Sequence, residues 1–287
     1  MLLRFSSLFI ALYIPFTRGK KLPTDRDNEL LSLIFKRDEC LSMIDAKRFF
    51  FESIINSNRL FELEFSNEKK CLEKLSSLSA MFSFSGTSFL FSGNILALVK
   101  EKIDRGDPYS VLVYELSAIM HDSLSGNWKF SNGYNDRLVN ENLKNLGVLV
   151  PAYISFHLQE IPVRNSYIES RKLITKLSDI GRIYEHTLSI VQMLGIKASL
   201  LARWGKIQEG LKETEQAISF IAKTPYNWHL VILYSVRARM FIMIGDIEGC
   251  ENSFYNADFI ISNLNLTPYS KRYYVSTKFL LHLHKLE

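Results

Sequence analysis

The sequence predicts an all-α protein, and three observations support this fold class. Only 13 glycines and 7 prolines occur in 287 residues, so few turns are obligatory. Apolar residues recur at spacings of three and four, which places them on one face of a helix. Turn signals recur about every twenty residues from Gly86 onward, and no run of strict alternation indicates a strand.

The N-terminal region, residues 1–65, is expected to contain the helices that begin the array. Residues 1–16 form an apolar run with one early positive charge; Pro15 interrupts this run, which is too short to span a bilayer. Two interpretations remain open at this point. The run is a buried first helix of a cytoplasmic protein, or it is the signal peptide of an exported one, although "TRGKK" follows instead of a small-residue cleavage site.

The region 66–287 is predicted to be a helical repeat array. Its turn signals lie at Gly86, Gly106, Gly126, Gly147, Asn165, Gly205, Pro225, Gly245 and Pro268. Apolar stripes at helical spacing fill the intervals, such as Cys71, Leu75, Leu78 and Phe82, and Ile247, Cys250, Phe254, Ala257, Ile261 and Leu264. Gly86 and Gly126 lie forty residues apart, as do Gly205 and Gly245, and a fixed period in this range indicates a solenoid of helix pairs.

Two modules within residues 190–265 share a more specific code. Small residues stand at Ala198, Gly210 and Ala217 around Gly205, and at Ala238, Cys250 and Ala257 around Gly245. Small side chains let neighbouring helices approach closely, while bulky ones such as Leu201 and Phe241 fill the remaining space. This code resembles the tetratricopeptide repeat, although the period is longer than in that family and its closing proline is displaced. The resemblance implies an α-solenoid of antiparallel helix hairpins with a period of about forty residues.

The resemblance also implies a function. In such a solenoid the first helices of the pairs line a concave groove that receives a protein or peptide partner. The groove positions then fall on Gln192, Ser199, Arg203, Ser235 and Arg239. Arginine in a groove suits a carboxylate or an acidic peptide. The long period and the phenylalanine-rich helices are similar to the helical-repeat segments of large bacterial signalling ATPases, so other domains of a larger signalling protein are further expected partners.

Two C-terminal segments carry expectations of their own. The residues from Leu230 to Ile244 are nearly all apolar, which predicts a helix buried on more than one side. The last segment, "YYVSTKFLLHLHKLE", is rather apolar for the cap of a stack, because a cap is expected to present a polar outer face. This apolar character leads us to expect that more chain follows the final helix.

Motifs for catalysis, cofactors and metals are absent from the sequence. It contains no phosphate loop, dinucleotide fingerprint, H-E-x-x-H or G-x-S-x-G motif, so we expect a non-catalytic scaffold without cofactor or metal. Two alternatives remain: an enzyme whose site is dispersed over a helical fold, and a secreted helical binding protein. The first would show convergent polar groups with shifted pKa values in a deep pocket.

Charge and cysteine usage fit this picture. The net charge of +5 is spread over both signs, and basic and aromatic residues mix at core spacing, so no nucleic-acid partner is expected. No stretch is long enough for a membrane span. Cys40, Cys71 and Cys250 lie far apart in helical patterns, which predicts three small core residues in a reducing compartment.

Overall fold

The computed structural model describes residues 2–14, 21–63, 69–127, 133–160, 167–266 and 268–286. Within these ranges every regular element is a helix, and the only bridge between extended residues pairs Lys21 with Leu63. The all-α prediction is therefore confirmed for the described part of the chain. The chain forms two compact units, residues 1–156 and 157–287, and the boundary between them lies within a helix. The predicted boundary between residues 65 and 66 falls inside the first unit.

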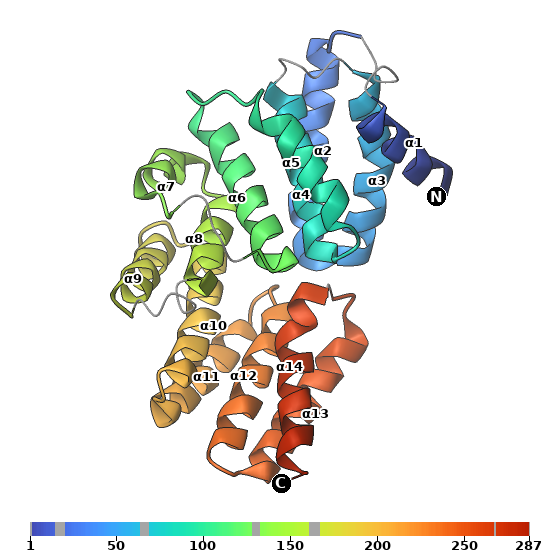
Figure 1. Cartoon of the computed structure of the whole chain (residues 1–287). Helices are drawn as coiled ribbons and strands as arrows, with labels where there is room; N and C mark the ends of the chain where they lie inside the picture. The colour runs from blue at the N-terminus through green and yellow to red at the C-terminus, as the bar shows by residue number, and fades with distance from the viewer. Residues whose placement is uncertain are drawn as a thin grey trace. The chain divides into compact units, whose positions relative to one another are not determined.

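In the described part of the first unit, the chain forms α1 to α7, a short 3-10 helix (Leu143–Asn145) and most of α8 (Figure 1). The α-helices are α1 (Leu2–Tyr13), α2 (Asp25–Ile44), α3 (Ala46–Glu62), α4 (Lys69–Ser85), α5 (Phe89–Lys100), α6 (Pro108–Ser125), α7 (Asp136–Asn142) and α8 (Leu149–Glu160). Local capping fixes several starts: Thr24 and Asp27 form a capping box on α2, and Asp107 with Pro108 begins α6.

Helix α4 is the centre of the first unit. It packs against α2, α3, α5 and α6. The stripe predicted there, Cys71, Leu75, Leu78 and Phe82, is almost fully buried. Because α4 has neighbours on several sides, its polar residues are also enclosed, including Glu73 and Lys74. This enclosure creates the ionic cluster described below.

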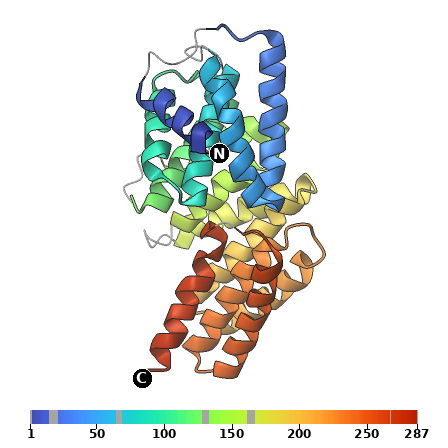
Figure 2. The ribbon, with the colours of Figure 1, turned by 90° about the vertical axis from the view of Figure 1, so that its right-hand side faces the viewer.

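The second unit consists of the end of α8 and six further helices. They are α9 (Tyr167–Ile183), α10 (Thr187–Arg203), α11 (Ile207–Ile221), α12 (Trp228–Met243), α13 (Ile247–Asn263) and α14 (Pro268–His284). Helix α10 packs against α9, α11 and α12, and α12 packs against α11, α13 and α14 as well. Figure 2 shows α14 along one edge of this unit. The prediction that the segment after Leu230 is buried on several sides agrees with the neighbours of α12.

The turn glycines explain how successive helices reverse direction. Gly86, Gly126, Gly205 and Gly245 all have a positive φ, between 65° and 82°. Only glycine adopts this left-handed conformation without steric cost, so these four residues end helices as the forty-residue spacing predicted. The turn between α9 and α10 uses Glu185 instead, with φ 50°. The turn predicted at Asn165 lies outside the described residues.

The small-residue code is the second confirmed local prediction. Ala198, Ala217, Ala238, Cys250 and Ala257 have no exposed surface. A Cβ added to Gly210 would lie 2.6 Å from Met240 Sδ, so the Met240 side chain of α12 occupies the space beside Gly210 and would have to move. One cysteine prediction was wrong: Cys71 and Cys250 are buried, but Cys40 is exposed on α2.

Candidate functional site

The five predicted groove residues differ in their access to solvent. On α10, Gln192 is buried, Ser199 is half-buried and Arg203 is exposed; on α12, Ser235 is fully buried and Arg239 is exposed. The Ser235 hydroxyl donates a hydrogen bond of 2.6 Å to the carbonyl oxygen of Val231 in its own helix. In this structure, therefore, only Ser199, Arg203 and Arg239 offer polar surface to a partner.

These residues belong to a series that continues into α14. Ser199, Arg239 and Phe279 are spaced forty residues apart on α10, α12 and α14, and all three reach solvent. Arg203, Met243 and Leu283 form a second series with the same spacing, and each is exposed. Three helices thus present side chains in register, polar on α10 and apolar on α14.

Charge is divided between alternate helices of the second unit. Helices α10, α12 and α14 contain lysine and arginine but no aspartate or glutamate, whereas α11 and α13 contain most of the nearby carboxylates. Lys197 on α10 pairs with Glu213 on α11 at 2.6 Å, and Arg237 on α12 lies 3.7 Å from Glu215. Glu213 and Glu215 thus connect α11 to the neighbouring helices. The sequence contains this signal, but it becomes visible only once helix boundaries separate the segments.

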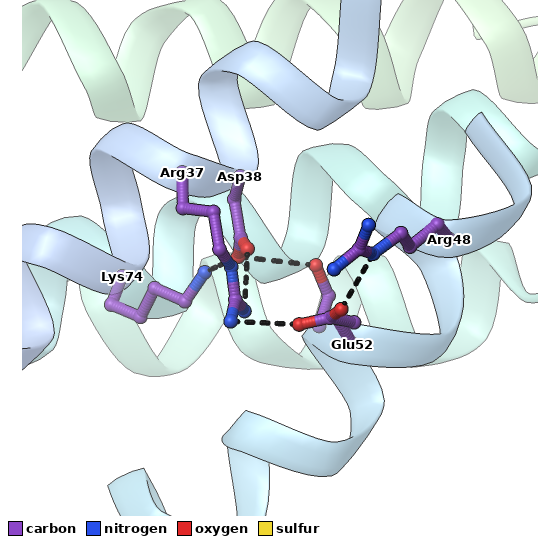
Figure 3. Close-up of polar contacts among 6 residues, drawn as sticks. Arg37, Asp38, Arg48, Glu52 and Lys74 are labelled. Atoms are coloured by element: carbon purple, nitrogen blue, oxygen red, sulfur yellow. Dashed lines mark hydrogen bonds and ion pairs between the residues drawn. The ribbon is translucent and has the colours of Figure 1, made fainter. Parts of the chain in front are cut away.

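A buried ion pair lies in the first unit (Figure 3). Asp38 on α2 accepts hydrogen bonds from the Lys74 ammonium on α4 and, at 3.2 Å, from the Ser53 hydroxyl on α3. All three side chains are almost fully buried. Burial lowers the pKa of Lys74, and attraction to Asp38 partly opposes that shift. The cluster therefore ties three helices together through one carboxylate.

Surface charges extend this cluster outward. Arg37 lies 3.4 Å from Asp38 and 2.7 Å from Glu52, and Glu52 also accepts a hydrogen bond of 2.8 Å from Arg48 (Figure 3). The hydrogen bond from Arg48 is the main reason why the pKa of Glu52 is lowered. The chain of contacts runs from the enclosed Lys74 to solvent-exposed guanidinium groups.

A second group of polar residues joins α4 to the start of α6. Glu73 accepts hydrogen bonds from Lys70 at 2.9 Å and from the Ser110 hydroxyl at 2.9 Å. Lys69 pairs with Asp107, the residue that begins α6, at 2.8 Å. Nearby on α2, burial raises the pKa of Glu39 to about 7, against the attraction of Lys36. A carboxyl group with such a pKa exchanges protons near neutral pH.

Three serines and a histidine form a polar core between α4, α5 and α6. Ser92 Oγ lies 2.8 Å from Ser79 Oγ, 2.6 Å from Ser83 Oγ and 3.0 Å from His121 Nδ1. The three serines are buried, and burial lowers the pKa of the half-buried His121. Because Ser92 has no exposed surface, its hydroxyl cannot reach a substrate in this conformation. His121, one turn before the end of α6, thus connects α6 to α5 through Ser92.

An enclosed histidine stands at the start of α12. His229 stacks on Trp228 with ring centroids 3.7 Å apart. Within the described chain, neither His229 Nε2 nor Trp228 Nε1 has a hydrogen-bond partner. Burial lowers the pKa of His229 to about 3, so this imidazole is neutral in the folded protein at neutral pH.

The described residues provide neither a metal site nor a membrane span. No group of three or more histidine, cysteine, aspartate or glutamate side chains there is arranged to hold a metal ion. Among these residues, no helix combines the length and the apolar character that crossing a bilayer requires.

No known protein family, curated protein or solved structure matches this chain. Fold and function therefore rest on the residues themselves. The ionic cluster of Asp38 and Lys74 is the group that sequence reasoning missed. Its signal is a charged residue at a core position: Lys74 stands three residues after Cys71 and one before Leu75, inside the predicted apolar stripe.

Proposed function

We propose that this chain is a non-catalytic interaction module of a signalling system. In this proposal α10–α13 form two tetratricopeptide-like hairpins, α14 begins a third unit, and the first helices α10, α12 and α14 line a concave surface that binds a protein partner. The module works in a reducing compartment, as the sensor or coupling part of a larger assembly. Export remains the alternative if residues 1–16 are cleaved.

One observation supports this proposal above the others. Helix α12 packs on α10 and on α14, while α11 and α13 each pack on the helix that precedes them. That pattern of contacts is expected when hairpins stack so that first helices meet first helices. The enclosed Ala198, Ala217, Ala238 and Ala257 give the reason for close approach. Exposed Arg203 and Arg239 then provide the polar part of the surface.

A charge-reversal capture experiment tests the proposal. The intact chain and the variants Arg239→Glu and Lys212→Glu serve as bait in a lysate of the native cell. Arg239 is exposed on a first helix, and Lys212 is exposed on a second helix, so the two changes match in charge but differ in face. We expect one protein to be recovered with the parent and with Lys212→Glu but lost with Arg239→Glu. Equal loss with both variants, or no protein at all, would contradict a groove on the first helices.

The polar groups of the first unit favour a second candidate, an enzyme with a dispersed site. The observations behind it are the pKa of about 7 at Glu39 and the lowered pKa of the enclosed Lys74. Incubating the parent chain and Glu39→Gln with a metabolite extract separates the two candidates. A metabolite consumed by the parent and spared by Glu39→Gln would establish the enzyme and end the scaffold proposal.

A further inference from the structure

Helix α14 and the turn after it expose an apolar stripe, which we call the α14 face: Val275, Phe279 and Leu283 on the helix, and Leu286 in the turn. The first three residues recur every four positions and therefore lie on one side of the helix. Val275 is 61% exposed and Phe279 62% exposed, although large apolar side chains at helical spacing are normally covered. The stripe runs along the edge helix seen in Figure 2.

On the preceding first helices only the position of Val275 is covered, since Arg239 and Met243, the counterparts of Phe279 and Leu283 on α12, are exposed. Val275 follows Ser235 by forty residues and Gly195 by eighty. Gly195 is buried, and a Cβ added there would lie 3.8 Å from His229 Nδ1 of α12. Ser235 has no exposed surface, and its helix packs on α14. The position of Val275 is thus buried on α10 and on α12 but open on α14, which indicates that a further helix fits at this end of the α14 face.

The charge of α14 specifies the kind of helix. Between residues 268 and 286 there are lysine, arginine and histidine residues but no carboxylate. Lys278 lies 3.9 Å from Asp258 of α13, and Lys285, just after α14, lies 2.6 Å from Glu251 of α13. Lys271, one turn before Val275, has no ion-pair partner within the described chain, and His282 is exposed beside Phe279. The half-exposed Lys271, unpaired among the described residues and on a helix without carboxylates, complements an acidic partner.

We propose that the α14 face binds an acidic amphipathic helix of a partner protein. Apolar residues of that helix pack on Phe279 and Leu283, and its carboxylates approach Lys271 and His282. A second copy of this chain fits less well, because pairing two α14 helices would bring like charges together. The inference rests on the proposed function in one respect, namely that first helices carry the binding surface.

Designed peptides provide the probe. One labelled peptide carries a leucine stripe flanked by glutamates at helical spacing, and its twin carries the same stripe flanked by lysines. Fluorescence anisotropy measures binding to the parent, to Phe279→Glu and to Phe259→Glu. Phe259, on α13, is 68% exposed, so this control places the same new charge at an equally exposed phenylalanine off the α14 face. Leu283→Ser is a second face variant, and circular dichroism confirms that each variant is folded.

The expected results are specific. The glutamate peptide binds the parent at least about tenfold more tightly than the lysine peptide, and Phe279→Glu weakens it by about tenfold or more. Phe259→Glu leaves binding within about twofold, and raising the salt from about 0.05 to about 0.5 M weakens binding. Leu283→Ser reduces affinity in the same direction as Phe279→Glu.

Several results would overturn the inference. If both peptides bound equally well, charge would not determine binding. If Phe259→Glu weakened binding as much as Phe279→Glu, the peptide would not bind on the α14 face. Binding only to vesicles rich in phosphatidylserine would make a lipid surface the occupant. If the parent chain were a dimer and Phe279→Glu were a monomer, the occupant of the α14 face would be a second copy of this chain. The capture experiment tests the proposed function through Arg239, whereas the peptide experiment tests this inference through Phe279. A failure of one is therefore distinguishable from a failure of the other.

Discussion

Small buried side chains set the distance between helices at individual positions. Ala217 and Ala257 have no exposed surface and stand forty residues apart on α11 and α13. Leucine at either position adds atoms where no room exists, and overpacking of this kind costs about 1–3 kcal/mol. We expect urea unfolding of Ala217→Leu and Ala257→Leu to show that loss. Gln216→Leu, at an exposed position of α11, is the matched control, and equal stability of all three variants would contradict close approach.

The ion pair of Asp38 and Lys74 is a second prediction at the level of residues. Removing Asp38 leaves the enclosed Lys74 ammonium without a counter-charge, and removing Lys74 leaves Asp38 with only the partly exposed Arg37 at 3.4 Å. Breaking a buried pair in this way costs about 3–5 kcal/mol. We therefore expect Asp38→Asn and Lys74→Met each to destabilise the protein strongly in urea. The double variant Asp38→Leu with Lys74→Met is expected to recover much of the loss, because no buried charge remains.

Arg137 and Glu141 provide the control for that ion pair. They lie 2.7 Å apart on α7, and the arginine side chain is 86% exposed. Exposed pairs contribute less than about 1 kcal/mol, so Arg137→Ala is expected to change the free energy of unfolding only slightly. If Asp38→Asn changed the free energy of unfolding as little as Arg137→Ala, the buried ion pair would not contribute more to stability than an exposed one.

His229 predicts a dependence of stability on pH. Its pKa falls from 6.5 to about 3 on folding, so the unfolded chain binds a proton that the folded chain excludes. Stability is therefore fully present above pH 6.5 and is lost as the pH falls toward 3. Between pH 7 and pH 5 the loss from this group is about 2 kcal/mol. Urea unfolding at both pH values is expected to show a smaller change for His229→Gln than for the parent. The exposed His282→Gln is expected to match the parent.

At the level of elements, the turns control where helices reverse. Nothing lies within 4 Å of a Cβ added to Gly205 or Gly245, so a side chain there meets no neighbour. The only cost of the substitution is the strain of a side chain on a backbone with positive φ. We expect Gly205→Ala to cost about 1 kcal/mol in thermal or urea unfolding. Glu185 holds the same kind of turn with a positive φ, and Glu185→Gly is expected to be neutral or stabilising. Destabilisation by Glu185→Gly would argue against strain at this turn.

Elements also show how far sequence reasoning reaches. The stripe from Cys71 to Phe82 and the turns at Gly205 and Gly245 were predictable, because helix periodicity and left-handed glycine are local properties. The turn at Glu185 was not, since glutamate carries no turn signal. The contacts of Asp38 with Ser53 and Lys74 are long-range, and a single sequence does not encode which helix faces which. The groove residues stay a prediction, and the full burial of Ser235 was not evident from its place in the sequence.

At the level of the whole molecule, the two compact units make a prediction about folding. Residues 167–286 contain their own apolar clusters, one centred on Val191, Leu233 and Val236 and another on Cys250 and Phe254. A fragment of residues 157–287 is therefore expected to fold alone, with helical circular dichroism and a cooperative urea transition. Non-cooperative loss of helical signal would show that this unit depends on the first one.

The division of charge between alternate helices has a kinetic consequence for any acidic binding partner. Arg203, Arg239 and Lys271 lie on helices without carboxylates, while Glu209 and Glu248 lie on the intervening ones. The second unit therefore has an electrostatic polarity that orients an approaching anionic molecule before any contact forms. Encounters would be steered toward one side, and mutating an outlying cation would slow association far more than it would hasten departure.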